Sequence, residues 1–112
     1  MEDMRHKKKE EMKLLLLNSK TKLIGESELS LGTVNTTLVS PREVFVEALR
    51  RNAVAVILLH NHPSGDPTPS KQDVLITRRV TEAGRLIGVE LLDHIIIGDN
   101  CFISLRDKGF FD

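Results

Sequence analysis

A continuous apolar run at residues 53–59 constrains the fold of this chain more than any other feature. The run reads Ala-Val-Ala-Val-Ile-Leu-Leu, with β-branched side chains and no polar position. Such a run is typical of a β-strand that is buried on both faces, in the middle of a sheet covered by helices. The string that follows it, His60-Asn61-His62-Pro63, places two imidazoles directly at the end of this buried strand.

Shorter apolar segments on either side of this run predict further strands. Residues 12–18 and 22–30 are separated by a polar turn and predict a β-hairpin. Residues 32–39 allow another turn and a short strand, and residues 89–97 and 101–104 predict two more strands. The total is five or six strands, with some antiparallel pairing in the hairpins.

Two capping boxes predict the starts of two helices. Ser40 is followed by proline and, three residues later, by Glu43; Ser70 is followed at the same spacing by Asp73. A serine hydroxyl and an acid at this spacing satisfy free N–H groups at a helix start. The second helix should end at Gly88. A βαβ crossover around residues 35–59 implies parallel pairing, so we expect an α/β fold with a mixed sheet flanked by helices.

Composition excludes several classes of protein. The chain has 112 residues, a single cysteine, no Trp or Tyr, and 16 basic against 16 acidic side chains, for a formal net charge of +0. We expect one domain without an internal disulfide, located in the cytoplasm. No apolar run approaches the ~20 residues of a membrane helix. Neutral charge and few aromatic residues argue against direct nucleic-acid binding by this domain.

The residues after the buried strand have the spacing of a metal site. His60 and His62 are two apart on a strand, so their side chains project to the same face. The Pro-rich loop at 63–69 reverses the chain and can return Asp73 to them as a third ligand. Two imidazoles and a carboxylate with an open fourth position are typical of catalytic zinc. Ser70 lies on the same helical face as Asp73 and could bond a bound water or an oxyanion.

Each of these residues also has a purely structural interpretation. Two histidines can simply form a polar strand end, and Ser70 and Asp73 can serve only as helix-capping residues. Capping and metal binding would compete for the Asp73 carboxylate. A hydrolase would also need a base for the attacking water. The pattern alone leaves six candidates for that base: Glu10, Glu11, Glu26, Glu28, Glu43 and Glu47.

The spacing His60-x-His62-Pro63 followed by Ser70-x-x-Asp73 resembles the JAMM motif of the JAB/MPN metallopeptidases. The strings at 41–45, 60–70 and 92–98 resemble the bacterial RadC group within that family, over residues 10 to 112. The resemblance implies a cytidine-deaminase-like α/β sandwich, Zn²⁺ held by His60, His62 and Asp73, and hydrolysis of peptide or isopeptide bonds in an unidentified peptide or protein substrate.

The resemblance also implies the base and the domain boundaries. The JAMM glutamate precedes the first strand of the hairpin, and Glu10 matches that position best, with Glu11 second. We therefore expect a flexible arm over residues 1–9 and a RadC-like domain over 10–112. RadC-like proteins commonly carry an upstream helix-hairpin-helix region, which this sequence lacks, so the chain is either a fragment or a short stand-alone form.

Other functions fit the residues less well than the metallohydrolase. The alternative function is an accessory module for DNA repair with a non-catalytic or vestigial metal site. The sequence also leaves open whether the chain forms a homodimer. A zinc nucleobase deaminase needs His-x-Glu and Pro-Cys-x-x-Cys, but the chain has only Cys101. The string at 60–62 matches an HNH nuclease only by accident, because those residues are not contiguous in that motif. His94 is expected to be a core or edge residue with its hydrogen bonds satisfied, with a role near the metal left open. Cys101 is expected to be a small buried hydrophobic residue.

Overall fold

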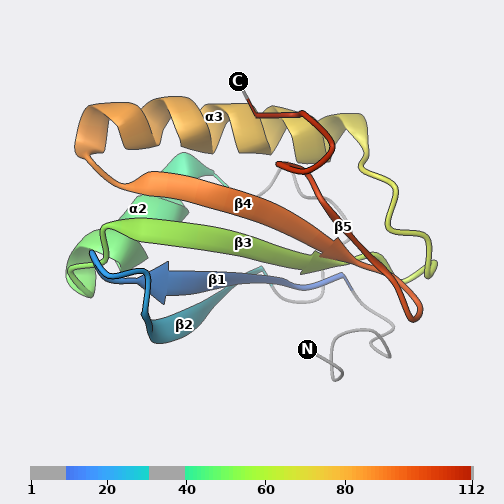
Figure 1. The fold of residues 1–112 in the computed structure, drawn as a ribbon, viewed down its shortest axis with the longest axis horizontal. Coiled ribbons are helices and arrows are strands. Elements are labelled where there is room, and N and C mark those ends of the chain that lie inside the picture. The colour runs from blue at the N-terminus through green and yellow to red at the C-terminus, as the bar shows by residue number, and fades with distance from the viewer. Residues whose placement is uncertain (1–9, 31–39, 112) are drawn as a thin grey trace.

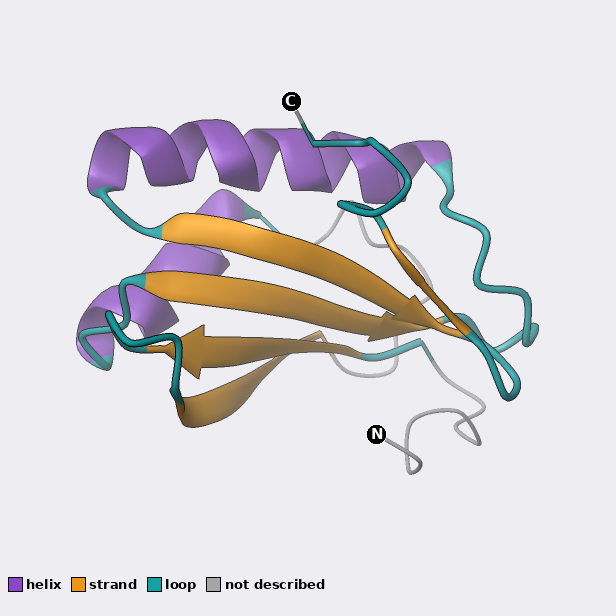
Figure 2. Cartoon of the chain, in the orientation of Figure 1, coloured by secondary structure: helices purple, strands orange, loops and turns teal. Residues whose placement is uncertain are grey.

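The computed structural model describes residues 10–30 and 40–111. Its elements form one sheet and two helices, which Figures 1 and 2 show in the same orientation. In chain order they are β1 (Met12–Leu17), β2 (Leu23–Ser30), α2 (Pro41–Arg50), β3 (Ala55–Asn61), α3 (Lys71–Ile87), β4 (Glu90–Ile97) and β5 (Phe102–Ser104). The expected arm at 1–9 and the expected turn and short strand at 32–39 lie outside the described residues.

The sheet is mixed, as the sequence predicts. The strand order is β2-β1-β3-β4-β5, and β3 pairs antiparallel with β1 and parallel with β4. The parallel pair is joined by α3, which Figure 1 shows running along the sheet. The crossover expected around residues 35–59 begins outside the described residues. The predicted α/β class with a mixed sheet is confirmed.

Both helices contribute to one hydrophobic core with the central strands. Alternate residues of β1 and β3 share a face: Leu14 pairs with Leu58 and Leu16 pairs with Val56. These side chains form one cluster with buried residues of α2 and α3, including Val44 and Val80. His60 follows Leu58 by two residues and so lies on that same face, and the strand carries its imidazole toward the helices.

The two predicted helix starts have different outcomes. At α3 the capping box is confirmed, because the Ser70 side chain and the Asp73 side chain each bond the other residue's main-chain N–H. At α2 the helix begins where predicted, but the capping box is wrong, because Ser40 makes no side-chain cap bond. Pro41 at the first helical position starts that helix without one. Gly88 ends α3 in the left-handed region, at φ 90°.

The strand predictions hold to within two residues at each end. The buried strand begins at Ala55 instead of residue 53 and continues through Asn61, so His60 is part of its regular ladder. The last strand begins at Phe102, one residue later than expected.

Of the two phenylalanines near the C-terminus, Phe111 packs on the core cluster, whereas Phe110 is 38% exposed.

No helix within residues 10–30 and 40–111 has the length and apolar character that crossing a membrane requires.

Candidate metal centre

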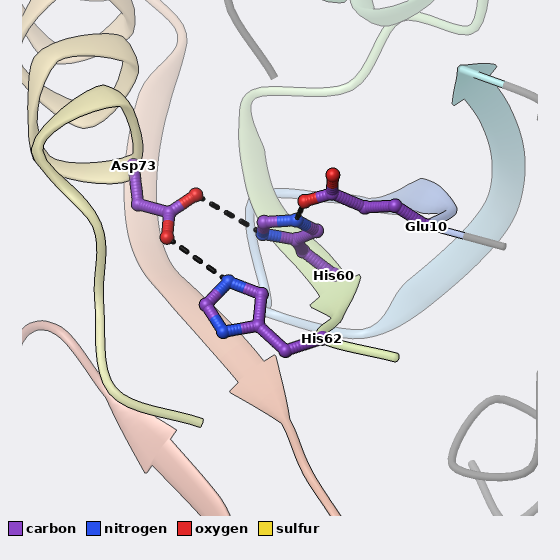
Figure 3. Close-up of side chains that lie close together, drawn as sticks. All are labelled: Glu10, His60, His62 and Asp73. Atoms are coloured by element: carbon purple, nitrogen blue, oxygen red, sulfur yellow. Dashed lines mark hydrogen bonds and ion pairs between the residues drawn. The ribbon is translucent and has the colours of Figure 1, made fainter. Parts of the chain in front are cut away.

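His60 is held at the buried end of β3. Its Cα partners are Met12 on β1 and Ile96 on β4, so strands on both sides fix its backbone. The side chain is fully buried, with 0% relative exposure. Its Nε2 atom contacts the carboxylate of Glu10, and its Nδ1 atom lies 3.4 Å from Oδ1 of Asp73. The imidazole therefore lies between two carboxylates, one from the segment before β1 and one from α3 (Figure 3).

His62 lies one residue beyond β3 and is oriented by the loop that follows. Its main-chain N–H donates to Ile97 over 2.9 Å, and its Nδ1–H donates to the main-chain oxygen of Asp66 over 2.9 Å. Because a carbonyl can only accept, Nδ1 carries a proton in the neutral as well as in the charged ring, and Nε2 is the nitrogen turned toward the cluster. The two imidazole rings of His60 and His62 lie edge to face with centroids 4.9 Å apart.

Asp73 divides its carboxylate between the helix cap and the cluster. Oδ2 accepts from the main-chain N–H of Ser70 at 2.8 Å and lies 3.1 Å from Nε2 of His62. Oδ1 is buried and accepts no hydrogen bond within the described residues, and Nδ1 of His60 is likewise without one. The two oxygens of the Asp73 carboxylate have different roles, so capping and metal binding do not compete as expected. The cap uses Oδ2 alone, and Oδ1 remains available for a cation.

The charges of Asp73 and His62 stabilise each other. Burial by itself would raise the pKa of Asp73, but hydrogen bonds from His62 and from Ser70 outweigh it and lower the pKa to about 2. The same bond to Asp73 raises the pKa of His62, and burial opposes the rise. The Asp73 side chain is thus anionic at neutral pH, which is the form a metal ligand needs.

Glu10 reaches the cluster from the segment just before β1 and is 9% exposed. The following residue is tied to the end of β3 twice: the N–H of Glu11 donates to Oδ1 of Asn61 over 2.6 Å, and the N–H of Asn61 donates to the oxygen of Glu11 over 3.3 Å. These bonds hold the chain so that the Glu10 side chain meets His60 (Figure 3).

The four side chains fit the demands of a metal ion. Glu10, His60, His62 and Asp73 each offer one ligand atom, and these atoms all lie within 4.8 Å of one another. Ligand atoms around a tetrahedral zinc at ~2.1 Å lie roughly 3.4 Å apart, so a small closure suffices. Two buried polar atoms without hydrogen bonds, Nδ1 of His60 and Oδ1 of Asp73, face each other inside this group. A cation would compensate for their lost hydration.

Four of the five predicted site residues therefore come together in one cluster, and Ser70 is not part of it. The three expected ligands and Glu10 share one cluster, which contains none of the other five candidate acids in the described part of the chain. Glu11 lies beside Asn61 instead, and Glu47 accepts a bond from Ser27.

Ser70 lies at the start of α3, next to the cluster in sequence. Its Oγ accepts from the N–H of Asp73 at 3.1 Å, and the residue is exposed. That bond uses a lone pair of the hydroxyl and leaves its proton for another acceptor. The structure therefore shows the capping role of Ser70, and the hydroxyl proton remains available for a second one.

Sequence reasoning missed the residues that hold this cluster in place. Asn61 stands in the sequence only as the residue between two histidines, yet it anchors the segment of Glu10. Gly98 permits a turn to approach the loop of His62, since a Cβ on it would lie 2.3 Å from the oxygen of Gly65. Thr77 bonds both Asp73 and His94. Gly98 directly follows the apolar run at 89–97, and a glycine at that position indicates a close approach of two chain segments. No local sequence pattern indicates a role for Asn61 or Thr77.

A five-stranded mixed sheet that carries a His-His-Asp-Glu cluster at the end of its central strand defines a domain of the JAB/MPN class. Comparison with known families narrows the class, because the family model of the RadC-like JAB domain matches residues 1–110. The chain belongs to this RadC family.

Curated relatives agree with this assignment. A UPF0758 protein of Caldanaerobacter subterraneus subsp. tengcongensis is 53% identical over 112 residues, which is 100% of this chain and 48% of that protein. A UPF0758 protein of Desulfitobacterium hafniense is 52% identical over 109 residues, 97% of this chain and 48% of the relative. One from Clostridium botulinum is 51% identical over the same shares. The chain thus spans about half the length of the curated relatives it matches.

Proposed function

We propose that this domain is a zinc-dependent hydrolase of peptide or isopeptide bonds. The observation that carries the proposal is the group of two imidazoles and two carboxylates whose ligand atoms lie within 4.8 Å of one another. Nitrogen and carboxylate oxygen donors suit zinc, and three protein ligands leave a position open for water. When bound, zinc lowers the pKa of water and polarises a carbonyl group.

Separate roles follow from how the residues are held. His60, His62 and Asp73 are the metal ligands, because each is fixed by β3, by the loop after it or by the first turn of α3. Glu10 is the general base: its carboxylate takes a proton from the attacking water and passes it to the leaving amine. Its place just outside regular structure, but tied through Glu11 to Asn61, supports a side chain that can move a proton between two partners.

Ser70 assists from the helix start. Its Oγ accepts from the N–H of Asp73, so the hydroxyl proton is available to a developing negative charge on the substrate oxygen. The exposure of Ser70 supports this role, since substrate must reach it from solvent.

The test compares two adjacent acids. Wild type, Glu10→Gln and Glu11→Gln are purified, their zinc content is measured, and turnover is followed on a peptide library that includes isopeptide-linked substrates. We expect all three to hold zinc, Glu11→Gln to turn over substrate at a rate close to wild type, and Glu10→Gln to lose roughly 100-fold or more.

Two other outcomes would change the account. Activity that survives in Glu10→Gln but is lost in Glu11→Gln would transfer the base role to the neighbouring acid. Zinc binding without turnover on any substrate, together with an affinity for DNA that falls steeply with salt, would favour the accessory module with a non-catalytic metal site.

A further inference from the structure

A hydroxyl on α3 and an imidazole on β4 tie the helix to the sheet directly behind the cluster. Oγ1 of Thr77 lies 2.8 Å from Nδ1 of His94 and donates over 2.8 Å to the main-chain oxygen of Asp73. Thr77 and His94 are both buried, at 1% and 0% exposure. The His94 ring lies beside that of His60, with centroids 5.6 Å apart and planes tilted by 32°.

The direction of these bonds follows from counting protons. A threonine hydroxyl has one proton, and a main-chain oxygen can only accept, so that proton goes to Asp73. Both contacts are hydrogen bonds at the same time only if His94 donates Nδ1–H to Thr77. His94 is therefore the neutral tautomer protonated at Nδ1, and its pKa is lowered to about 3, first by burial and then by the neighbouring His60.

His94 is costly as a purely structural residue. Its Nε2 atom is buried and has no hydrogen-bond partner within the described residues. An unsatisfied buried acceptor costs free energy that an apolar side chain on β4 would avoid. The compensating gain has to come from the other nitrogen, which bonds Thr77.

We propose that Thr77 and His94 are a positioning pair that fixes the first turn of α3 against β4 and thereby sets the place of the Asp73 carboxylate relative to the imidazoles. The inference rests on the proposed function, because it concerns the same metal centre. The capping box of Ser70 and Asp73 is local to the helix and cannot fix the helix to the sheet. The loop that leads into α3 is bonded to the turn after β4 at Gly65, whereas Thr77 and His94 join the helix itself to β4.

Thr81, one turn further along α3, provides a matched control for Thr77. Oγ1 of Thr81 donates to the main-chain oxygen of Thr77 over 2.7 Å, which repeats the bond from Thr77 to Asp73 one turn further along. Thr81 is half-buried, and its bond lies within the helix and does not reach a strand. Thr77→Val and Thr81→Val thus each remove one helical hydroxyl of the same kind, but only the first breaks a tie to β4.

The experiment has one readout without metal and one with it. In the metal-free full chain, hydrogen exchange is measured in the first turn of α3 at the amides of Asp73 and Val74, whose N–H groups bond Ser70. Zinc affinity is then measured by competition with a chelator of known affinity. For Thr77→Val we expect first-turn exchange at least tenfold faster and a zinc dissociation constant roughly 10–100-fold larger, the range for partners that orient metal ligands. Thr77→Ser should restore both, and Thr81→Val should stay within about threefold of wild type.

Each outcome separates this inference from the proposed function. If Thr77→Val matches Thr81→Val in exchange and in zinc affinity, the positioning role is wrong, whatever the turnover of wild type. If Thr77→Val and Thr81→Val weaken zinc equally, the effect is one of helix stability, and the positioning role is again wrong. If wild type binds no zinc, the proposed function fails, and the exchange rates of the metal-free protein still decide the inference.

Discussion

The side-chain oxygen of Asn61 accepts a hydrogen bond of 2.6 Å from the main-chain N–H of Glu11, 50 residues earlier in the chain. This bond joins the end of β3, which carries His60, to the segment that carries Glu10. The place of the candidate base relative to the candidate ligands therefore depends on one amide side chain that is not itself part of the metal cluster.

Loss of that side chain should affect turnover more than metal binding. Asn61→Ala leaves the Glu11 N–H without its partner, and we expect the free energy of unfolding to fall by about 1–3 kcal/mol. His60, His62 and Asp73 keep their own supports, so zinc affinity should change little while kcat falls as Glu10 loses its place. Chemical unfolding, chelator competition and turnover measure the three quantities.

Asn18→Ala is the matched control for this change. The Asn18 side chain also accepts main-chain N–H groups, from Lys20 and Lys22, but in an exposed turn at the other end of β1. We expect a smaller loss of stability and no change in kcat. Equal effects of the two substitutions on kcat would contradict the role given to Asn61.

A methyl group at Gly98 should displace the loop of His62. The added Cβ would lie 2.3 Å from the oxygen of Gly65 and 2.8 Å from Cδ of Pro67. That loop is also tied to this turn by a 2.8 Å bond from the N–H of Asp99 to Gly65. For Gly98→Ala we expect a loss of stability of ~1–3 kcal/mol from overpacking and a clear loss of zinc affinity.

Gly88→Ala provides the comparison at the far end of α3. Gly88 has φ +90° and nothing within 4 Å of an added Cβ, so the cost is backbone strain of about 1–2 kcal/mol without a clash. Zinc affinity should stay at the wild-type value. A zinc dissociation constant that rises as much for Gly88→Ala as for Gly98→Ala would show that general destabilisation explains both.

Buried His94 should make the metal-free protein sensitive to acid. Its pKa is about 3 in the folded chain against an ordinary value of 6.5, so between these values the unfolded chain binds the extra proton. Stability contributed by the neutral ring is therefore complete above pH 6.5 and is lost as the pH falls toward 3. Between pH 7 and pH 5, wild type should lose about 2 kcal/mol more of unfolding free energy than His94→Gln. Parallel pH profiles for the two proteins would contradict a neutral buried His94.

Removal of zinc should lower the melting temperature, because the ion would join the end of β3 and the loop after it to the first turn of α3. At a free zinc concentration about 100 times its dissociation constant, binding adds about 2.7 kcal/mol, or roughly 10 °C in Tm for a chain of this size. The shift should vanish in His60→Ala. A Tm that is indifferent to chelator in wild type would contradict a metal bound by the folded state.

The fold was predictable where the pattern is local. The apolar run at 53–59 and the capping box at Ser70 mark β3 and the start of α3 because their signals lie within a few residues. The capping box expected at Ser40 is wrong, because Pro41 starts α2 without a side-chain bond. The parallel pair is formed through α3, a pairing between strands that no short-range signal specifies.

The site residues likewise divide into those that a local sequence pattern predicts and those that only the folded chain brings together. His60, His62 and Asp73 could be named from their spacing, since the strand period and the returning loop bring them together. The six candidate acids could not be separated by pattern, because the choice depends on the register of β1 against β3, which places Met12 opposite His60. The supports given by the Asn61 amide, the Thr77 hydroxyl and the turn at 98 act across more than fifteen residues of sequence, so only the folded arrangement reveals them.

The measurement that tests the metal centre most directly is the zinc content of the purified chain and of two ligand variants. We predict about one zinc per chain in wild type and close to none in His60→Ala or Asp73→Asn. The second variant retains a side-chain oxygen for the capping box, so its loss of zinc would not come from loss of the helix start. Zinc retained at the wild-type ratio in both variants would contradict the assignment of His60 and Asp73 as ligands.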